Sequence, residues 1–239
     1  MKEVFQSPFF FLSKGTRWNQ AEEEISLRLH YDSDMVDAVT LGADGVARCA
    51  WPGDDELYVQ YHDQEWGYPE GNDKKLFEKI CLEGFQAGLA WITILRKREH
   101  FREAFSSFDF NKISRYGEKE IQALKSNADI VRHEGKIRSV INNAHRAKEL
   151  ITEQGSLKNY FWYFSQFVTD GPYEEIPAQT ALSEAISKDL KDRGWTWVGP
   201  TTVYSLMQAT GIVNDHHLEC DLHKIIQSKR ESFMRSLQG

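Results

Sequence analysis

Two kinds of hydrophobic pattern divide the chain near residue 47. Residues 25–31 alternate apolar and polar side chains like a half-buried strand, and Asp44-Gly45 is typical of a turn. From about Asp73 onward, apolar residues recur at helical spacing. We therefore expect an N-terminal extension with some β structure at residues 1–47 and a compact all-α domain at residues 48–239.

The longest helical pattern begins at Asp73, a residue that can cap a helix, and its apolar stripe continues to Leu95. The basic run Arg96-Lys97-Arg98 suits the C-terminal end of that helix. Further helices are expected at about 99–106, 117–127, 133–153, 157–167, 181–192 and 201–210.

Composition indicates a soluble globular protein. The chain has 239 residues, of which 41% are hydrophobic, enough for a buried core. No apolar run approaches the ~18 residues of a membrane helix, so we expect no membrane contact and a cytoplasmic location. Three cysteines do not indicate a disulfide framework, and we expect all of them to be reduced.

The net charge of −7 argues against a partner bound mainly through phosphates. The charge is unevenly spread, however, because residues 1–47 hold four basic and eight acidic groups. Between Arg132 and Lys148, five basic residues accompany one Glu. This stretch is either a basic patch for nucleic acid or a solvated helix face.

Two Cys/His pairs indicate a metal site. Cys49 and His62 are separated by twelve residues, and His216 and Cys220 by three, which on one helical turn puts both side chains on the same face. A Cys₂His₂ set is typical of a structural zinc site, which here would close a loop of about 170 residues.

Other interpretations of the same residues stay open. The cysteines and histidines can be unrelated, and His217 and His223 are competing ligands. A catalytic zinc with Asp215 or Glu219 as oxygen ligand or base is less favoured, because two thiolates lower the Lewis acidity of the ion and four protein ligands leave no position for water.

Glu83 is the carboxylate that hydrophobic packing does not explain. In an unbroken helix it lies on the apolar stripe, whereas Gly84 and Gly88 could break the helix and place Glu83 at a helix end facing a cleft. It is either a buried Glu satisfied by a neighbour or the floor of a pocket for a flat, cationic ring. The surrounding segment is dense in aromatic residues: Trp51, Tyr58, Tyr61, Trp66, Tyr68, Phe77, Phe85 and Trp91.

Residues 181–210 are typical of two helices joined by a short turn. Pro200 fits the first turn of the second helix, and Gly199 lets the backbone approach a ligand closely. The backbone N–H groups of Thr201 and Thr202 would then form an anion site at a helix N-terminus. The segment resembles a helix-hairpin-helix element that grips one DNA phosphate without reading sequence.

Several motifs in order resemble the DNA-3-methyladenine glycosylase I family, over about Arg48 to Cys220. They are Arg48-Cys49-Ala50-Trp51, Tyr61-His62-Asp63-Gln64-Glu65-Trp66-Gly67, Leu82-Glu83-Gly84-Phe85-Gln86-Ala87-Gly88-Leu89-Ala90-Trp91, Val198-Gly199 and Val213-Asn214-Asp215-His216.

This resemblance implies a helix-hairpin-helix DNA glycosylase fold with one structural zinc ion on Cys49, His62, His216 and Cys220. It also implies that Glu83 and Tyr61 hydrogen-bond the damaged base while Trp91 stacks on it. The walls of the base site would be Trp51, Tyr58 and Trp66. The DNA contacts would come from Leu89 and Gly88, in the gap left by the flipped nucleotide, and from the hairpin at Gly199.

The chain departs from the family pattern in four places. Residues 1–47 have no counterpart. Ala90 stands where Ser is expected, Phe85 stands where a polar residue is common, and Trp197 replaces a small residue of the general hairpin.

The expected function is base excision repair: flipping of 3-methyladenine out of double-stranded alkylated DNA and hydrolysis of its N-glycosidic bond. No Lys lies among the pocket motif residues, so we expect no strand cleavage. We expect a monomer without a protein partner. The alternatives are a zinc-stabilised DNA-binding module without catalysis and a zinc hydrolase of small molecules, which would lose activity but not its fold on chelation.

Overall fold

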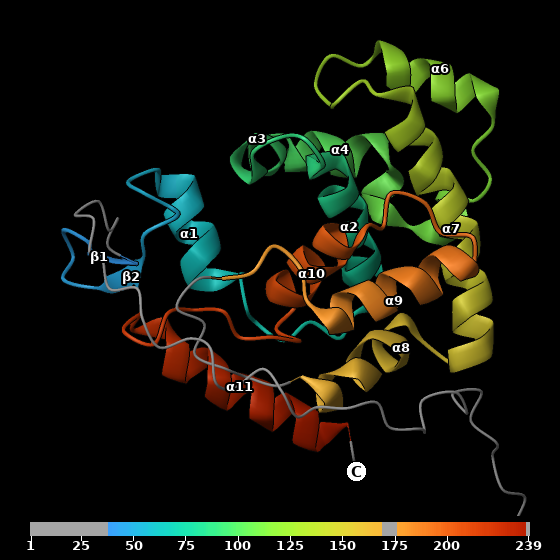
Figure 1. The fold of residues 1–239 in the computed structure, drawn as a ribbon. Helices are drawn as coiled ribbons and strands as arrows, with labels where there is room; N and C mark the ends of the chain where they lie inside the picture. Colours follow the sequence, from blue (N-terminus) through green and yellow to red (C-terminus); the bar gives the residue numbers. More distant parts are fainter. Residues whose placement is uncertain (1–37, 169–175, 238–239) are drawn as a thin grey trace, which may run out of the picture. The chain divides into compact units, whose positions relative to one another are not determined.

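The computed structural model describes residues 38–168 and 176–237 (Figure 1). They lie in one compact unit, Asp37–Gly239. The strand expected at residues 25–31 lies outside the described residues. Two short strands, β1 (Val39–Leu41) and β2 (Ala47–Cys49), pair antiparallel with Val39 opposite Cys49. Gly45 adopts φ +78° in the turn between them, so the turn predicted from Asp44-Gly45 is confirmed.

The rest of the described chain is mainly helical. The elements are α1 (Glu56–Gln64), α2 (Asp73–Gln86), α3 (Trp91–Arg96), α4 (Arg98–Ala104), η1 (Ser106–Phe108), α5 (Phe110–Ile113), α6 (Glu118–Ser126), α7 (Glu134–Gln154), α8 (Leu157–Tyr163), η2 (Phe164–Phe167), α9 (Ala181–Asp192), α10 (Pro200–Ala209) and α11 (Leu222–Ser236). Helices α4, α6, α7, α9 and α10 confirm the predicted segments within two residues, whereas α1, α5 and α11 were not predicted.

The helical pattern from Asp73 to Leu95 is not one helix. The alternative, a break near Gly88 that leaves Glu83 at a helix end, is confirmed. Helix α2 ends at Gln86 and α3 begins at Trp91, because Gly88 adopts φ +80°, a left-handed conformation that a helix does not contain. The N-cap was also misplaced by one residue. Asn72 caps α2 by accepting hydrogen bonds from two backbone N–H groups, while Asp73 accepts one from the N–H of Lys158.

Helix α2 is the central element of the core. Figure 1 shows it between α7 and α10, and α9 packs against α10. Phe85 is buried in this core, with its ring 4.5 Å from that of Phe101. All three cysteines are free and buried. Within the described residues, no helix has the length and apolarity needed to cross a membrane.

Candidate active site and metal centre

The structure brings Cys49, His62, His216 and Cys220 together, as the spacing predicted. Their ligand atoms all lie within 4.8 Å of one another, and all four residues are buried. The Cys220 Sγ is 3.7 Å from His62 Nε2 and 3.5 Å from His216 Nδ1, and Cys49 Sγ is 3.9 Å from His216 Nδ1. Tetrahedral Zn–S and Zn–N bonds of about 2.3 and 2.0 Å set ligand atoms roughly 3.5 Å apart. The donor set therefore fits a four-coordinate metal ion.

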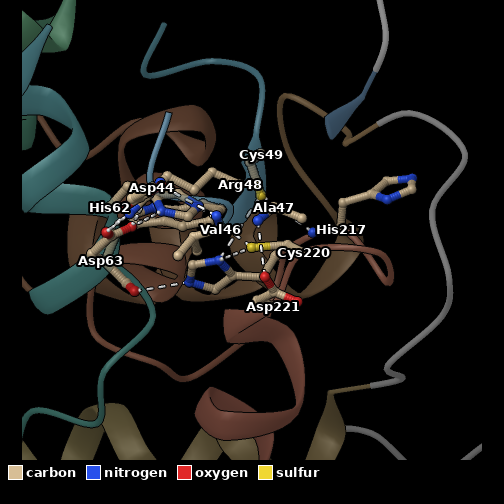
Figure 2. A network of polar contacts seen from close by, with 12 residues as sticks. Asp44, Val46, Ala47, Arg48, Cys49, His62, Asp63, His217, Cys220 and Asp221 are labelled. Carbon is tan, nitrogen blue, oxygen red and sulfur yellow. Dashed lines mark hydrogen bonds and ion pairs between the residues drawn. The ribbon is translucent and has the colours of Figure 1, made fainter. Parts of the chain in front are cut away.

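Both histidine rings are oriented by hydrogen bonds on their outer nitrogens. His62 Nδ1 lies 2.8 Å from Asp63 Oδ1 (Figure 2). His216 Nε2 lies 3.1 Å from the Trp66 carbonyl oxygen. When those nitrogens carry the proton, His62 Nε2 and His216 Nδ1 present lone pairs to the centre of the cluster. Sequence reasoning identified the four candidate ligands but missed this second layer.

Arg48 completes that layer. Its guanidinium donates hydrogen bonds of 2.7–2.9 Å to both Asp63 oxygens and to Asp44. Burial raises the pKa of Asp63, but the hydrogen bonds from Arg48 and His62 together with the charge of Arg48 outweigh burial, so the pKa of Asp63 is lowered overall. The Asp63 carboxylate is thus ionised, and in this form it can accept a hydrogen bond from the imidazole N–H of His62.

The competing ligands lie outside the cluster. His223 Nδ1 is 2.6 Å from the carbonyl oxygen of His216, and the ring of His217 accepts a hydrogen bond from the N–H of Glu219. Asp215 is buried but accepts hydrogen bonds from Tyr204 and Gln208. Among the described residues the grouping consists of the four predicted side chains.

Direct hydrogen bonds also join the two ends of the domain next to the cluster. The backbone N–H of Ala47 donates to Asp221 Oδ2, and the N–H of Asp221 donates to the Ala47 carbonyl oxygen, each at 2.9 Å. Strand β2 and the segment before α11 therefore meet through protein contacts as well as through the Cys/His cluster.

A cavity of about 210 Å³ lies beside the cluster. This is below the roughly 300–1,000 Å³ of pockets for drug-sized ligands, so it suits one small ring system. Its walls contain all six residues predicted to contact the base, with four that were not predicted: Trp51, Tyr58, Tyr61, Trp66, Glu83 and Trp91, together with Gln86, Ile176, Ser205 and Gln208.

The aromatic walls form a chain of ring contacts that reaches the metal ligands. The ring centroid of Trp51 is 4.8 Å from Tyr58 and 5.1 Å from Trp66. On the other side, Trp51 is 5.3 Å from the ring of His62, and Trp66 is 4.6 Å from that of His216. Any movement of the histidines would therefore be transmitted to the cavity walls.

Glu83 occupies the last turn of α2 with only 5% of its surface exposed. No hydrogen bond or ion pair from a described residue reaches its carboxyl group, so the interpretation of a buried Glu satisfied by a neighbour was wrong. Burial raises its pKa to about 8, and Lys79, one turn earlier on α2, acts in the opposite direction. Burial also raises the pKa of Tyr61, so this phenol is a hydrogen-bond donor.

Helix α10 supplies two polar pocket residues that the sequence did not single out. Ser205 and Gln208 are three positions apart, the spacing of one helix face. The carboxylate of Asp215 lies 2.8 Å from Gln208 Nε2 and 2.7 Å from the Tyr204 hydroxyl, so it fixes the side chain of Gln208. The signal in the sequence was polar residues at helical spacing in an otherwise apolar helix.

The four residues between α2 and α3, Ala87 to Ala90, are all exposed and connect Gln86 to Trp91, two residues of the cavity wall. Gly88 needs its left-handed backbone there, and Leu89 exposes 41% of its surface. Ala90 is the N-cap of α3 and makes no side-chain cap hydrogen bond, which the Ser expected at this place would supply.

Helices α9 and α10 are joined by a short turn, as the sequence predicted. Gly199 is the N-cap of α10 and Pro200 its first residue, so the amides of Thr201 and Thr202 lie in the first turn, without acceptors in the helix. Asn143 of α7 fixes the turn, because it accepts a hydrogen bond from the N–H of Thr196 and donates one to its carbonyl oxygen.

The basic stretch from Arg132 to Lys148 does not form an open patch. Lys136 is buried, Arg138 pairs with Glu118 and Glu134, and Arg146 pairs with Glu149. Most of its charge is neutralised by neighbouring carboxylates or turned inward.

The fold and these sites define a mainly helical protein with a cavity for one planar ring, braced by a buried Cys/His cluster. A sequence profile of the methyladenine glycosylase family matches residues 51–224. The DNA-3-methyladenine glycosylase 1 of Escherichia coli strain K12 is 46% identical over 177 residues, which cover 72% of this chain and 95% of that protein. The DNA-3-methyladenine glycosylase of Haemophilus influenzae Rd is 43% identical, over 72% of this chain and 96% of its own length.

Solved structures agree with these matches. A crystal structure of 3-methyladenine DNA glycosylase I has a TM-score of 0.70 and 44% identity, covering 74% of this chain and 99% of its own. The Staphylococcus aureus enzyme, studied for its recognition of 3-methyladenine, has a TM-score of 0.69 and 32% identity, covering 73% and 95%. The chain belongs to the methyladenine glycosylase family.

Proposed function

We propose that this protein removes 3-methyladenine from alkylated double-stranded DNA by hydrolysing the N-glycosidic bond. The observation that carries the proposal is the unpaired carboxylate of Glu83, buried at an aromatic cavity of the size of one base. The relatives named DNA-3-methyladenine glycosylase support the same substrate.

Selection of the damaged base would be the main task of the cavity. Alkylation at N3 makes adenine cationic, and the ring faces of Trp91 and Trp51 with the Glu83 carboxylate attract a flat cation. The nucleotide would be flipped out of the duplex at a cost of a few kcal/mol, smaller for a damaged base. Tyr61, with its raised pKa, would donate a hydrogen bond to the base.

The chemistry then needs little acid catalysis. Water adds to the sugar carbon as it acquires oxocarbenium character, and the bond to the base breaks. The bonding electron pair neutralises the departing ring, and the proton of the water goes to solvent. The two Thr amides at the start of α10, Gly199, and Gly88 with Leu89 would hold the DNA.

We further propose that the Cys/His cluster binds one structural zinc ion. The donor set and the oriented imidazoles fit such an ion, which when bound would join β2 and α1 to the segment before α11. Four protein ligands leave no position for water, which favours a structural role over a hydrolytic one. The monomeric state and the cytoplasmic location stay predictions from the sequence.

Incubation with methylated duplex DNA, followed by chromatography of the released bases, tests the function. We expect free 3-methyladenine and an abasic strand that stays intact until alkali is added. DNA binding without any released base would favour the non-catalytic DNA-binding module instead. A covalent complex trapped by borohydride would refute the absence of strand cleavage.

A further inference from the structure

The C-terminal end of α2 has backbone carbonyl groups that need hydrogen-bond donors. The last carbonyl groups of any helix lack donors within the helix. At α2 the chain leaves the helical conformation at Ala87 (φ −46°, ψ 115°), and no basic residue lies in the last turn. The N–H of Leu89 donates to the carbonyl oxygen of Gln86, whereas the carbonyl groups of Phe85 and Ala87 take their donor from another element.

Lys136 supplies this donor from α7. Its ammonium nitrogen lies 2.9 Å from the carbonyl oxygen of Phe85 and 2.6 Å from that of Ala87, and the residue is only 5% exposed. The positive charge sits at the negative end of the α2 dipole, where a cation is stabilised. No other described side chain donates a hydrogen bond to the backbone of residues 87–90.

The same ammonium also faces the hairpin. It lies 5.2 Å from the ring centroid of Trp197, a residue with φ +57° in the turn between α9 and α10. Gly84 of α2 lies against this turn as well, since a Cβ atom there would be 3.2 Å from the Trp197 carbonyl oxygen. Lys136 therefore touches α2, the loop 87–90 and the hairpin at once.

We propose that Lys136 is a positioning residue that fixes the loop carrying Leu89 relative to Glu83 and the hairpin. The inference rests on the proposed function, in which Leu89 fills the gap left by the flipped nucleotide. The loop is exposed at every residue, so packing holds it weakly. The N–H of Leu89 bonds locally to the carbonyl oxygen of Gln86, and the hydrogen bond from Lys136 to Ala87 ties the loop to another helix. Because the ammonium is engaged with two carbonyl groups, Lys136 acts through the backbone and not as a nucleophile.

The test compares Lys136→Met, which removes the donors, with Lys136→Arg, which keeps them. Single-turnover release of 3-methyladenine from methylated duplex DNA should fall roughly 10- to 100-fold in Lys136→Met, the effect of a small misplacement of a reacting assembly. Lys136→Arg should retain most of the rate. Lys119→Met, an exposed lysine on α6, is the matched control and should leave the rate unchanged.

Two further readouts separate positioning from loss of fold. Binding of free 3-methyladenine, followed by fluorescence of the pocket tryptophans, should be unchanged in Lys136→Met. Leu89→Ala by itself should slow base release. Added to Lys136→Met it should slow release little further, because the effects of two residues that act through one loop are not additive. Additive effects, unchanged release, or an equal loss of free-base binding would each overturn the proposal.

Amide hydrogen exchange measures the proposed role of Lys136 directly, without a measurement of base release. The amides of residues 87–91 should exchange faster in Lys136→Met, or in Lys136→Gln if the first variant does not fold, while those of α9 stay protected. If the wild-type chain releases no base, the proposed function fails. The positioning role is then decided by hydrogen exchange and by affinity for duplex DNA containing an abasic site, and unchanged values in the variant would refute it.

Discussion

Glu83 differs from two other buried acidic residues in having no hydrogen-bond or ion-pair partner among the described residues. Glu78 pairs with Arg102, and Asp215 accepts hydrogen bonds from Tyr204 and Gln208. Glu83 is at least as buried as these two and has no such partner among the described residues. A buried carboxyl group without a hydrogen-bond partner opposes folding, and in the proposed function its ionised form meets the cationic base.

The raised pKa of Glu83 sets a pH dependence. With a pKa of about 8, the carboxyl group is largely protonated at neutral pH and becomes anionic as the pH rises through 8. If the anion attracts the cationic base, kcat/KM should rise about tenfold per pH unit below that value and level off above it. The pH profile of base release from methylated DNA measures this.

Two variants control this prediction. Glu83→Gln should abolish the rise and lower the activity. Lys79→Met should move the midpoint to higher pH, because Lys79 lowers the pKa of Glu83. A profile that is the same in wild type and Glu83→Gln would assign the titration to another group.

At the scale of elements, the break between α2 and α3 decides how the site is built. An uninterrupted helix would carry residues 87–90 along the α2 axis. The left-handed Gly88 instead ends α2 one turn after Glu83 and lets α3 begin with Trp91 on the wall of the same cavity. One glycine thus brings the ends of two helices to one pocket.

Gly88→Ala should lower the free energy of unfolding by about 1–2 kcal/mol, the cost of a left-handed conformation for an L-residue. The new Cβ atom meets nothing within 4 Å, so the effect comes from the backbone alone. Gly199→Ala is the matched control. It also meets nothing within 4 Å but has φ −62°, so it carries no left-handed penalty. It should lower the free energy of unfolding by less than Gly88→Ala does, through the weaker N-cap preference of Ala alone. Denaturant titration of both variants measures the difference, and equal effects would contradict this explanation.

At the scale of the whole molecule, the Cys/His cluster joins segments about 170 residues apart in sequence. The link passes through the pocket wall, since Trp51 and Trp66 contact the rings of His62 and His216. Stability and base recognition are therefore expected to depend on the same cluster.

Removing the metal with a chelator, or replacing a ligand by Cys220→Ser, should lower the melting temperature and weaken binding of free 3-methyladenine together. Cross-linking a loop of this length stabilises a fold by up to about 4–5 kcal/mol in the loop-entropy account. Elemental analysis should find one zinc per chain. Cys81→Ala is the control, because Cys81 lies in the core and should leave the zinc content unchanged.

Chelation also separates the proposed roles of the ion. Loss of activity with an unchanged melting temperature would contradict a structural zinc and favour the zinc hydrolase. A loss of activity together with a lower melting temperature is the outcome expected for a structural zinc ion that supports the fold.

The sequence by itself determined the helices whose apolar period is regular, such as α7 and α9, because side-chain burial there follows local spacing. It also determined the candidate ligands and the carboxylate at position 83, since Cys, His and a misplaced Glu stand out by chemistry alone. It did not determine α1 or α11, and it left open whether α2 is continuous, because the non-helical torsions of Ala87 and Gly88 override the periodic pattern there.

Only the tertiary structure decided which groups meet. The orientation of His62 by Asp63, the entry of Ser205 and Gln208 into the cavity, and the contact of Lys136 with Ala87 all join residues from different elements. It also turned a basic stretch of sequence into ion pairs and a buried ammonium. Spacing along a chain fixes which side chains share a face of one helix, whereas their partners depend on how the helices pack.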